Sequence, residues 1–137
     1  MAVTNQTLVD TSFKTIIKTV CDNAANANGD NVKIVDASAL SGADSNPRLS
    51  IAKIFYSIES ASGGVELKWD ATTNVQCTIL TGNGSYGYMP GQPSLTNNAG
   101  SGISGDVNVV NATGTFTLVT EFHKVSGFTN TNEATNP

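Results

Sequence analysis

Charged and catalytic side chains are scarce in this sequence. Only 13% of its 137 residues are charged, and it contains one histidine, two cysteines and one tryptophan. An average globular domain has about 25% charged residues, and general acid–base catalysis uses histidine most often. We therefore expect no enzyme active site, no cofactor and no bound metal ion.

Basic residues are also few and dispersed. Seven Lys and Arg stand against eleven Asp and Glu, which gives a net charge of −4. Nucleic acids and anionic membranes are bound by clustered cations, so neither is expected as a partner. No stretch approaches the roughly 18 consecutive apolar residues of a transmembrane helix, and residues 1–6 lack the basic and apolar regions of a signal peptide.

The two cysteines, Cys21 and Cys77, lie far apart in the sequence. A zinc site would need closely spaced Cys and His residues. Without a secretory signal, the thiols are expected to stay reduced. We interpret both as small hydrophobic residues of the core.

Thr, Asn, Ser and Gly take the place of the missing charges. Thr favours strands, whereas Asn and Gly favour turns. Apolar and polar residues alternate over residues 65–70, with Val65, Leu67 and Trp69 on one face, and a similar alternation occurs over residues 115–125. This period of two predicts an all-β chain.

The fold expected from this pattern is an antiparallel β-sandwich or jelly-roll-like barrel of about seven or eight strands. Residues 1–10 are expected as an N-terminal arm or edge strand, residues 11–126 as the sandwich domain and residues 127–137 as a polar tail. Residues 22–30 and 36–48 read as loops. The other expected strands are residues 13–20, 32–35, 49–59, 65–70, 75–81, 106–110 and 115–125.

Two strand pairings and one bulge are also predicted. The Ser- and Gly-rich residues 60–64 are expected to form a hairpin turn between the strands that flank them. Residues 106–110 and 115–125 are expected to pair as the last two strands. A change of phase near Ala52 indicates a β-bulge.

Residues 82–105 are expected to form one long, ordered, Gly- and Pro-rich surface loop with a role in binding. Its Tyr86, Tyr88, Met89 and Leu95 are candidate partner contacts. The N-terminal arm, which could add a strand to a neighbouring sheet edge, supplies the remaining candidates. These are Val3, Leu8 and Val9.

Two motifs that could carry chemistry fail on inspection. Residues 82–87 match G-x-G-x-x-G, but Pro90 and Gly91 follow, so no helix can open as a dinucleotide site requires. His123 is expected to be a partly exposed strand residue beside Glu121 rather than a member of a catalytic triad.

Aromatic residues could form a sugar-binding platform. The candidates are Trp69, Tyr86, Tyr88 and Phe128. Trp69 lies on the apolar face of an alternating strand, which favours a place in the core. A carbohydrate-binding module stays open as an alternative function.

Several stretches of the chain resemble a family of small virion structural proteins of tailed bacteriophages, particularly those of marine cyanobacteria. The resemblance is carried by residues 5–10, 34–42, 65–71, 82–87 and 124–128. It implies a small β-sandwich that decorates or cements a capsid, binds the major capsid protein and forms a homo-oligomer, with a trimer favoured. The implied location is the capsid surface, after synthesis in the host cytoplasm. A neck, tail or fibre component is the alternative within a virion.

Overall fold

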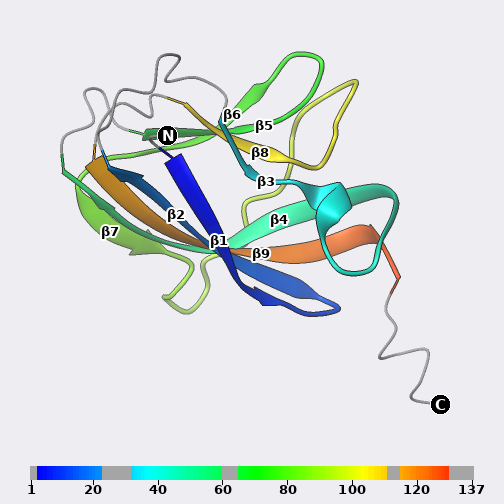
Figure 1. Ribbon diagram of the computed structural model, residues 1–137, viewed down its shortest axis with the longest axis horizontal. Coiled ribbons are helices and arrows are strands. Elements are labelled where there is room, and N and C mark those ends of the chain that lie inside the picture. Colours follow the sequence, from blue (N-terminus) through cyan, green and yellow to red (C-terminus); the bar gives the residue numbers. More distant parts are fainter. Residues whose placement is uncertain (1–2, 23–31, 60–64, 111–114, 130–137) are drawn as a thin grey trace.

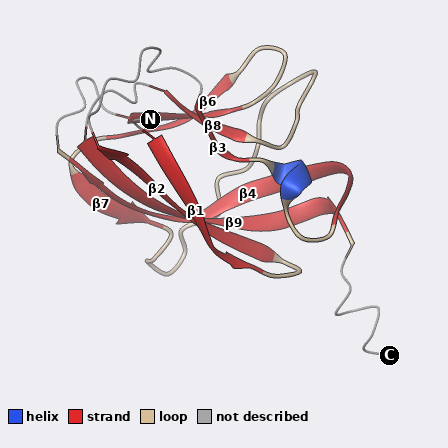
Figure 2. Ribbon diagram, in the orientation of Figure 1, coloured by secondary structure: helices blue, strands red, loops and turns tan. Residues whose placement is uncertain are grey.

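Two antiparallel β-sheets pack face to face in the computed structural model, which describes residues 3–22, 32–59, 65–110 and 115–129 (Figure 1). One sheet has five strands in the order β1-β2-β9-β4-β7, and the other has four in the order β3-β8-β5-β6. Figure 2 shows strands nearly throughout, with one short 3-10 turn, η1 (Ala37–Ala39). The predicted all-β sandwich is confirmed. The strands are β1 (Val3–Asp10), β2 (Lys14–Asp22), β3 (Val32–Val35), β4 (Ala43–Ile58), β5 (Val65–Trp69), β6 (Val75–Leu80), β7 (Asn83–Tyr86), β8 (Val107–Val110) and β9 (Thr115–Phe128).

The core lies between the sheets and follows the alternation in the sequence. Val65, Leu67 and Trp69 of β5 are at most 1% exposed, as the pattern predicted. Phe116 and Phe122 of β9 face them from the five-stranded sheet and are also buried. Each such side chain contributes about 1.5–3 kcal/mol by leaving water, so these two strands hold the layers together.

Strand β4 contains the predicted bulge. Its pairing with β9 shifts between Ile51 and Lys53, which leaves Ala52 as the extra residue. The strand also begins at Ala43, so the prediction of a loop over residues 36–48 was wrong for its second half. This part of β4 is irregular. Asn46 has a φ of 53°, and the pairing with β9 is interrupted between Ala43 and Arg48. A strand of this kind is difficult to distinguish from a loop in the sequence.

The Gly- and Pro-rich segment is not one continuous loop. Its first part is β7, which pairs with β4 at the edge of the five-stranded sheet. Glycine weakens a strand by propensity, and a Cβ at Gly84 would come 2.7 Å from the Tyr56 hydroxyl, so that the Tyr56 side chain would have to shift. The structure consequently has nine strands among its described residues rather than the expected seven or eight.

Both predicted pairings between consecutive strands were wrong. β4 lies in the five-stranded sheet and β5 in the four-stranded sheet, and β8 and β9 are divided in the same way. Sequential strands pair or neighbour one another in roughly two thirds of cases, but here the chain crosses between layers at most connections. The hairpins among the described strands are β1–β2 and β5–β6.

Some predicted segments lie outside the described residues. They include the turn over residues 60–64, most of the loop over residues 22–30 and the tail from residue 130 onward. The tail was predicted to start at residue 127, whereas β9 continues to Phe128. Within the described ranges, no helix has the length and apolar character needed to cross a membrane.

Candidate functional site

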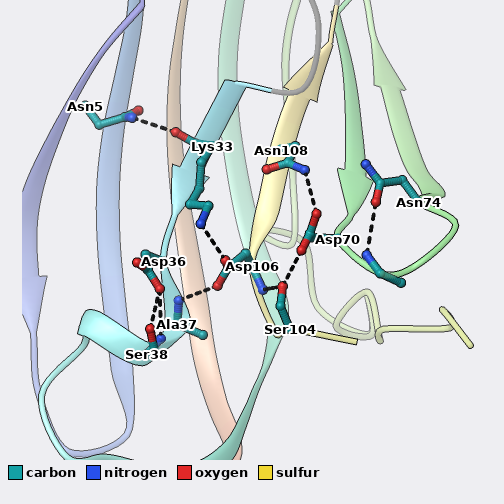
Figure 3. A network of polar contacts seen from close by, with 11 residues as sticks. Asn5, Lys33, Asp36, Ala37, Ser38, Asp70, Asn74, Ser104, Asp106 and Asn108 are labelled. Atoms are coloured by element: carbon teal, nitrogen blue, oxygen red, sulfur yellow. Dashed lines mark hydrogen bonds and ion pairs between the residues drawn. The ribbon is translucent and has the colours of Figure 1, made fainter. Parts of the chain in front are cut away.

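A buried carboxylate, Asp106, lies directly before β8 and joins three parts of the structure (Figure 3). Its Oδ1 accepts a 2.8 Å hydrogen bond from the backbone N–H of Ala37 in η1. Its Oδ2 lies 2.9 Å from Nζ of Lys33 on β3. The hydrogen bond to Asp106 raises the pKa of Lys33 above its ordinary value of 10.5. Both carboxylate oxygens are therefore engaged within the fold.

Asp70, directly after β5, extends this network. Its two carboxylate oxygens accept hydrogen bonds from Ser104 Oγ at 2.6 Å and from Asn108 Nδ2 at 3.1 Å. The backbone N–H of Asp106 donates to Ser104 Oγ at 3.2 Å. Within the described residues, no group of three or more His, Cys, Asp or Glu could hold a metal ion. We interpret the network as an anchor of the four-stranded sheet.

Neighbouring contacts extend this anchoring role. Asp36 caps η1 by accepting a 3.1 Å hydrogen bond from the backbone N–H of Ser38. It also accepts a 2.7 Å hydrogen bond from Ser38 Oγ, which lowers the pKa of the Asp36 carboxyl. Asn5 Nδ2 on β1 donates to the Lys33 carbonyl on β3 at 3.0 Å. This bond joins the outer strands of the two sheets along one side of the sandwich.

A second buried charge, Lys124, lies near the end of β9. Its side chain is 1% exposed, and Nζ lies 2.7 Å from Asp10 Oδ1. The same ammonium donates to the carbonyls of Thr11 at 2.6 Å and Ser41 at 2.7 Å. It also lies over the Phe128 ring, 5.1 Å from the centroid. An ammonium has three donors, and these contacts use them to tie β9 to the β1–β2 turn and to the turn between η1 and β4.

His123 projects from the outer face of the five-stranded sheet. Its side chain is 45% exposed, and Nε2 lies 2.8 Å from Glu121 Oε2. The prediction of a partly exposed strand histidine beside Glu121 is confirmed.

The two cysteines are thiols in the structure and are not joined in a disulfide. Cys21 is buried as predicted, whereas Cys77 on β6 is only partly buried. Burial raises the pKa of Cys77 to about 12. At neutral pH this side chain is therefore a protonated thiol and a poor nucleophile.

The predicted contact residues of the N-terminal arm are placed differently from one another. The arm is β1, hydrogen-bonded along β2 as the outermost strand of its sheet. Val3 pairs with Cys21 and is 5% exposed, so it belongs to the core and not to a contact surface. Leu8 is 48% exposed beside an irregularity in the pairing, and Val9 is half-buried.

The predicted contacts of the loop also divide. Tyr88 and Met89 are exposed, by 53% and 67%. Tyr86 is half-buried, and its hydroxyl donates to the Pro93 carbonyl at 2.8 Å. Leu95 is partly buried, because it forms a β-bridge with Ile51 and packs against the core. The sequence could not reveal this long-range bridge.

An apolar groove lies on the outer face of the five-stranded sheet. It has a volume of about 330 Å³ and is lined by Phe55, Ser85, Tyr88 and Val119. Val119 and Phe55 are cross-strand partners on β9 and β4, and Ser85 on β7 continues the same row. Phe55 is 47% exposed. This row brings Tyr88 together with two residues, Phe55 and Val119, that the sequence did not single out.

The turn after β7 holds Tyr88 over this face. Gln92 Oε1 accepts hydrogen bonds from the backbone N–H groups of Gly87 at 2.7 Å and Met89 at 3.2 Å. Gly87 has a φ of 92°, and a Cβ there would collide with the Ala52 carbonyl at the bulge. The Lys53 ammonium lies 5.3 Å from the centroid of the Tyr88 ring, within the range of a cation–π contact. The turn is therefore packed against β4.

The aromatic platform considered for sugar binding is not assembled. Trp69 is 1% exposed in the core, and Phe128 packs beneath the Lys124 ammonium. Of the four candidates, only Tyr88 lines the groove.

Comparison with models of protein families, with curated proteins and with solved structures finds no match to this chain. The stretches on which the expected resemblance to phage virion proteins is based lie on β1, on β3 with η1, on β5, on β7 and at the end of β9. They are therefore spread over both sheets and do not mark one site.

Proposed function

We propose that this chain is a structural protein of a virion, a capsid decoration or cement protein. It binds the outside of the major capsid protein shell and stabilises it. The observation that supports binding is the apolar groove between Phe55 and Tyr88. The virion assignment rests on the resemblance of the stretches named above. A homo-oligomer is the expected form, and a trimer would match the local three-fold positions of an icosahedral shell.

The groove is a feature that the fold itself does not use. The buried charges Asp106 and Lys124 are engaged by neighbouring strands and turns, and so they serve the fold. Phe55, Tyr88 and Met89, in contrast, expose large apolar surfaces close together in the sheet and its adjoining turn. Contiguous exposed apolar surface on a folded protein marks contact sites. A role in binding explains why these side chains are not polar.

The test is occupancy on purified shells that lack the native protein. A Phe55→Ser, Tyr88→Ser double variant should lose binding because it removes both apolar walls of the groove. Ile79→Ser is the matched control, since Ile79 is 52% exposed on β6 in the other sheet. Equal occupancy by the double variant and the wild type would overturn the assignment of the contact face.

Two alternatives have distinct outcomes. A neck, tail or fibre component would leave shells bare and appear at those positions in electron-microscopy maps of purified particles. A carbohydrate-binding module would bind immobilised glycans, and the double variant would abolish that binding. Either result would replace the capsid assignment.

A further inference from the structure

Two lysines lie beside the groove. Cross-strand register places Lys18 opposite Val119, Lys53 opposite Glu121 and Lys14 opposite His123 on the outer face of the five-stranded sheet. The same register places Asp22, opposite Thr115, on this face. With histidine neutral, three lysines, Glu121 and Asp22 give this face a charge of 3 − 2 = +1. The chain carries −4, so the remaining residues carry −4 − 1 = −5.

The fold uses other lysines in its ion pairs. Lys33 pairs with Asp106 and Lys124 pairs with Asp10. In the part of the chain that the structure describes, neither Lys14 nor Lys18 nor Lys53 forms an ion pair. Each is half-buried, so its aliphatic stem covers the sheet while the ammonium stays at the surface. Their charges are available to a partner.

Lys18 lies opposite Val119 and Lys53 lies against Tyr88, and both of these partners line the groove. The combination of positive charge and an apolar groove identifies the partner. We propose that the outer face of the five-stranded sheet binds an acidic protein surface. One apolar side chain of that surface enters the groove between Phe55 and Tyr88, and its carboxylates lie against Lys18 and Lys53. This inference rests on the proposed function and names the chemistry of the partner.

Other anionic partners fit the face less well. Nucleic-acid binders commonly neutralise about 6–10 phosphates, and polybasic membrane sites have about 4–8 Lys or Arg. Here two lysines, Lys18 and Lys53, lie beside an apolar groove, and Glu121 is the cross-strand partner of one of them. The groove has a volume of about 330 Å³, which is close to the lower end, about 300 Å³, of the range for small-molecule pockets. A groove of this size has room for a single side chain of a protein.

Peptide titrations followed by NMR test this proposal without a virus. The probe is the peptide Glu-Ser-Glu-Phe-Glu-Ser-Glu, and the controls replace every Glu by Lys or the Phe by Ser. The acidic Phe peptide should shift the amide signals of Lys18, Phe55 and Val119. Its affinity should fall as salt rises from about 0.05 M to about 0.5 M, because exposed charges are screened. Both control peptides should bind more weakly.

Matched single variants locate the charge effect. Lys18→Gln should weaken the affinity for the acidic peptide by about two- to fivefold, which is the effect of losing one exposed ion pair. Lys68→Gln, on the four-stranded sheet, should leave the affinity unchanged. Thermal melts of both variants establish that they fold.

Several outcomes would overturn the inference. They are equal binding of acidic and basic peptides, no binding of the acidic peptide, or an unchanged affinity of Lys18→Gln. Preferential binding of DNA or of phosphatidylserine vesicles through this face, or sedimentation showing that it holds a second copy, would give the face another occupant. If the acidic peptide binds but the shells stay bare, the inference about the partner holds and the capsid role is refuted. If the shells are bound but the peptide is not, the capsid role holds and the inference is refuted.

Discussion

Replacing Asp106 by alanine removes the carboxylate that joins β8 to η1. Ala37 is 0% exposed, and its N–H donates to that carboxylate at 2.8 Å. A buried N–H that loses its acceptor costs about 1–3 kcal/mol. The ion pair with Lys33 adds at most about 1 kcal/mol, because half of the Lys33 side chain is exposed. We therefore expect Asp106→Ala to lower the free energy of unfolding by about 1–4 kcal/mol.

Lys33→Met is the matched control, because it removes the ion pair and keeps the acceptor for Ala37. It should cost less than about 1 kcal/mol. Urea unfolding, followed by the fluorescence of Trp69, the one tryptophan, gives both values. Equal losses in the two variants would refute the reasoning, because the ion pair and not the buried N–H would then be the larger contribution.

The same pair makes a prediction about pH. Asp106 raises the pKa of Lys33 above 10.5, so the folded state holds this proton more tightly than the unfolded state. The stabilisation is fully present below the unfolded pKa and is lost as pH rises through the folded pKa. The difference in stability between wild type and Lys33→Met should therefore be constant near neutral pH and shrink in strong alkali. A difference that grows with alkaline pH would contradict the assigned sign.

Three further predictions test the core, the turn and the thiol. Trp69→Ala should cost about 3–5 kcal/mol of unfolding free energy, measured by urea unfolding with circular dichroism; a loss below about 1 kcal/mol would contradict its place in the core. Gly87→Ala should be more destabilising than Gly91→Ala in thermal melts, because both have positive φ but only at Gly87 would the Cβ collide, with the Ala52 carbonyl; equal effects would show that the turn can move away from β4. Cys77, with its pKa raised to about 12, should react slowly with iodoacetamide near pH 8 in the native protein and quickly in urea; rapid native alkylation would show an accessible thiolate.

Local alternation was sufficient to predict most of the strands. Val65, Leu67 and Trp69 face the core because successive side chains of a strand point to opposite sides. The phase change at Ala52 was visible for the same reason. β7 was missed because three glycines lie within or next to it, Gly82, Gly84 and Gly87, and composition assigns such a segment to a loop.

Strand pairing could not be predicted in the same way. A short Ser- and Gly-rich connection is compatible with a hairpin and with a crossover between layers, and the choice depends on contacts made by residues distant in the sequence. Phe116 pairs with Cys21 and Ile58, for example, rather than with any residue of β8. Such non-local pairing leaves no mark on the composition of the turn.

Of the residues that form the candidate site, only those that lie in a loop were predicted from the sequence. Tyr88 and Met89 were identified because a Gly- and Pro-rich segment carries few other apolar side chains. Phe55 and Val119 were missed because each lies in a strand rich in apolar residues, and a partner surface is recognisable there only once the inward face is known. Lys18 was missed because its significance depends on lying opposite Val119.

The bulge in β4 determines that face. Ile51 points into the core, and strict alternation would send Lys53 and Phe55 inward after it. The extra residue, Ala52, reverses the phase, so that Ile54 is 1% exposed while Phe55 is 47% exposed. The phase change that was readable in the sequence is thus the cause of the exposed aromatic ring, although the ring itself was not recognised as a contact.

The same bulge positions the opposite wall of the groove. Gly87 packs against the Ala52 carbonyl, and the next residue, Tyr88, lies over Lys53. One irregularity therefore exposes Phe55, seats the turn that carries Tyr88 and places a cation at the rim of the groove. Bulges frequently occur where a strand must redirect a side chain beside a functional site. These three effects of the bulge all act on one groove. A binding role of the groove explains them together, whereas without such a role each effect would need its own explanation.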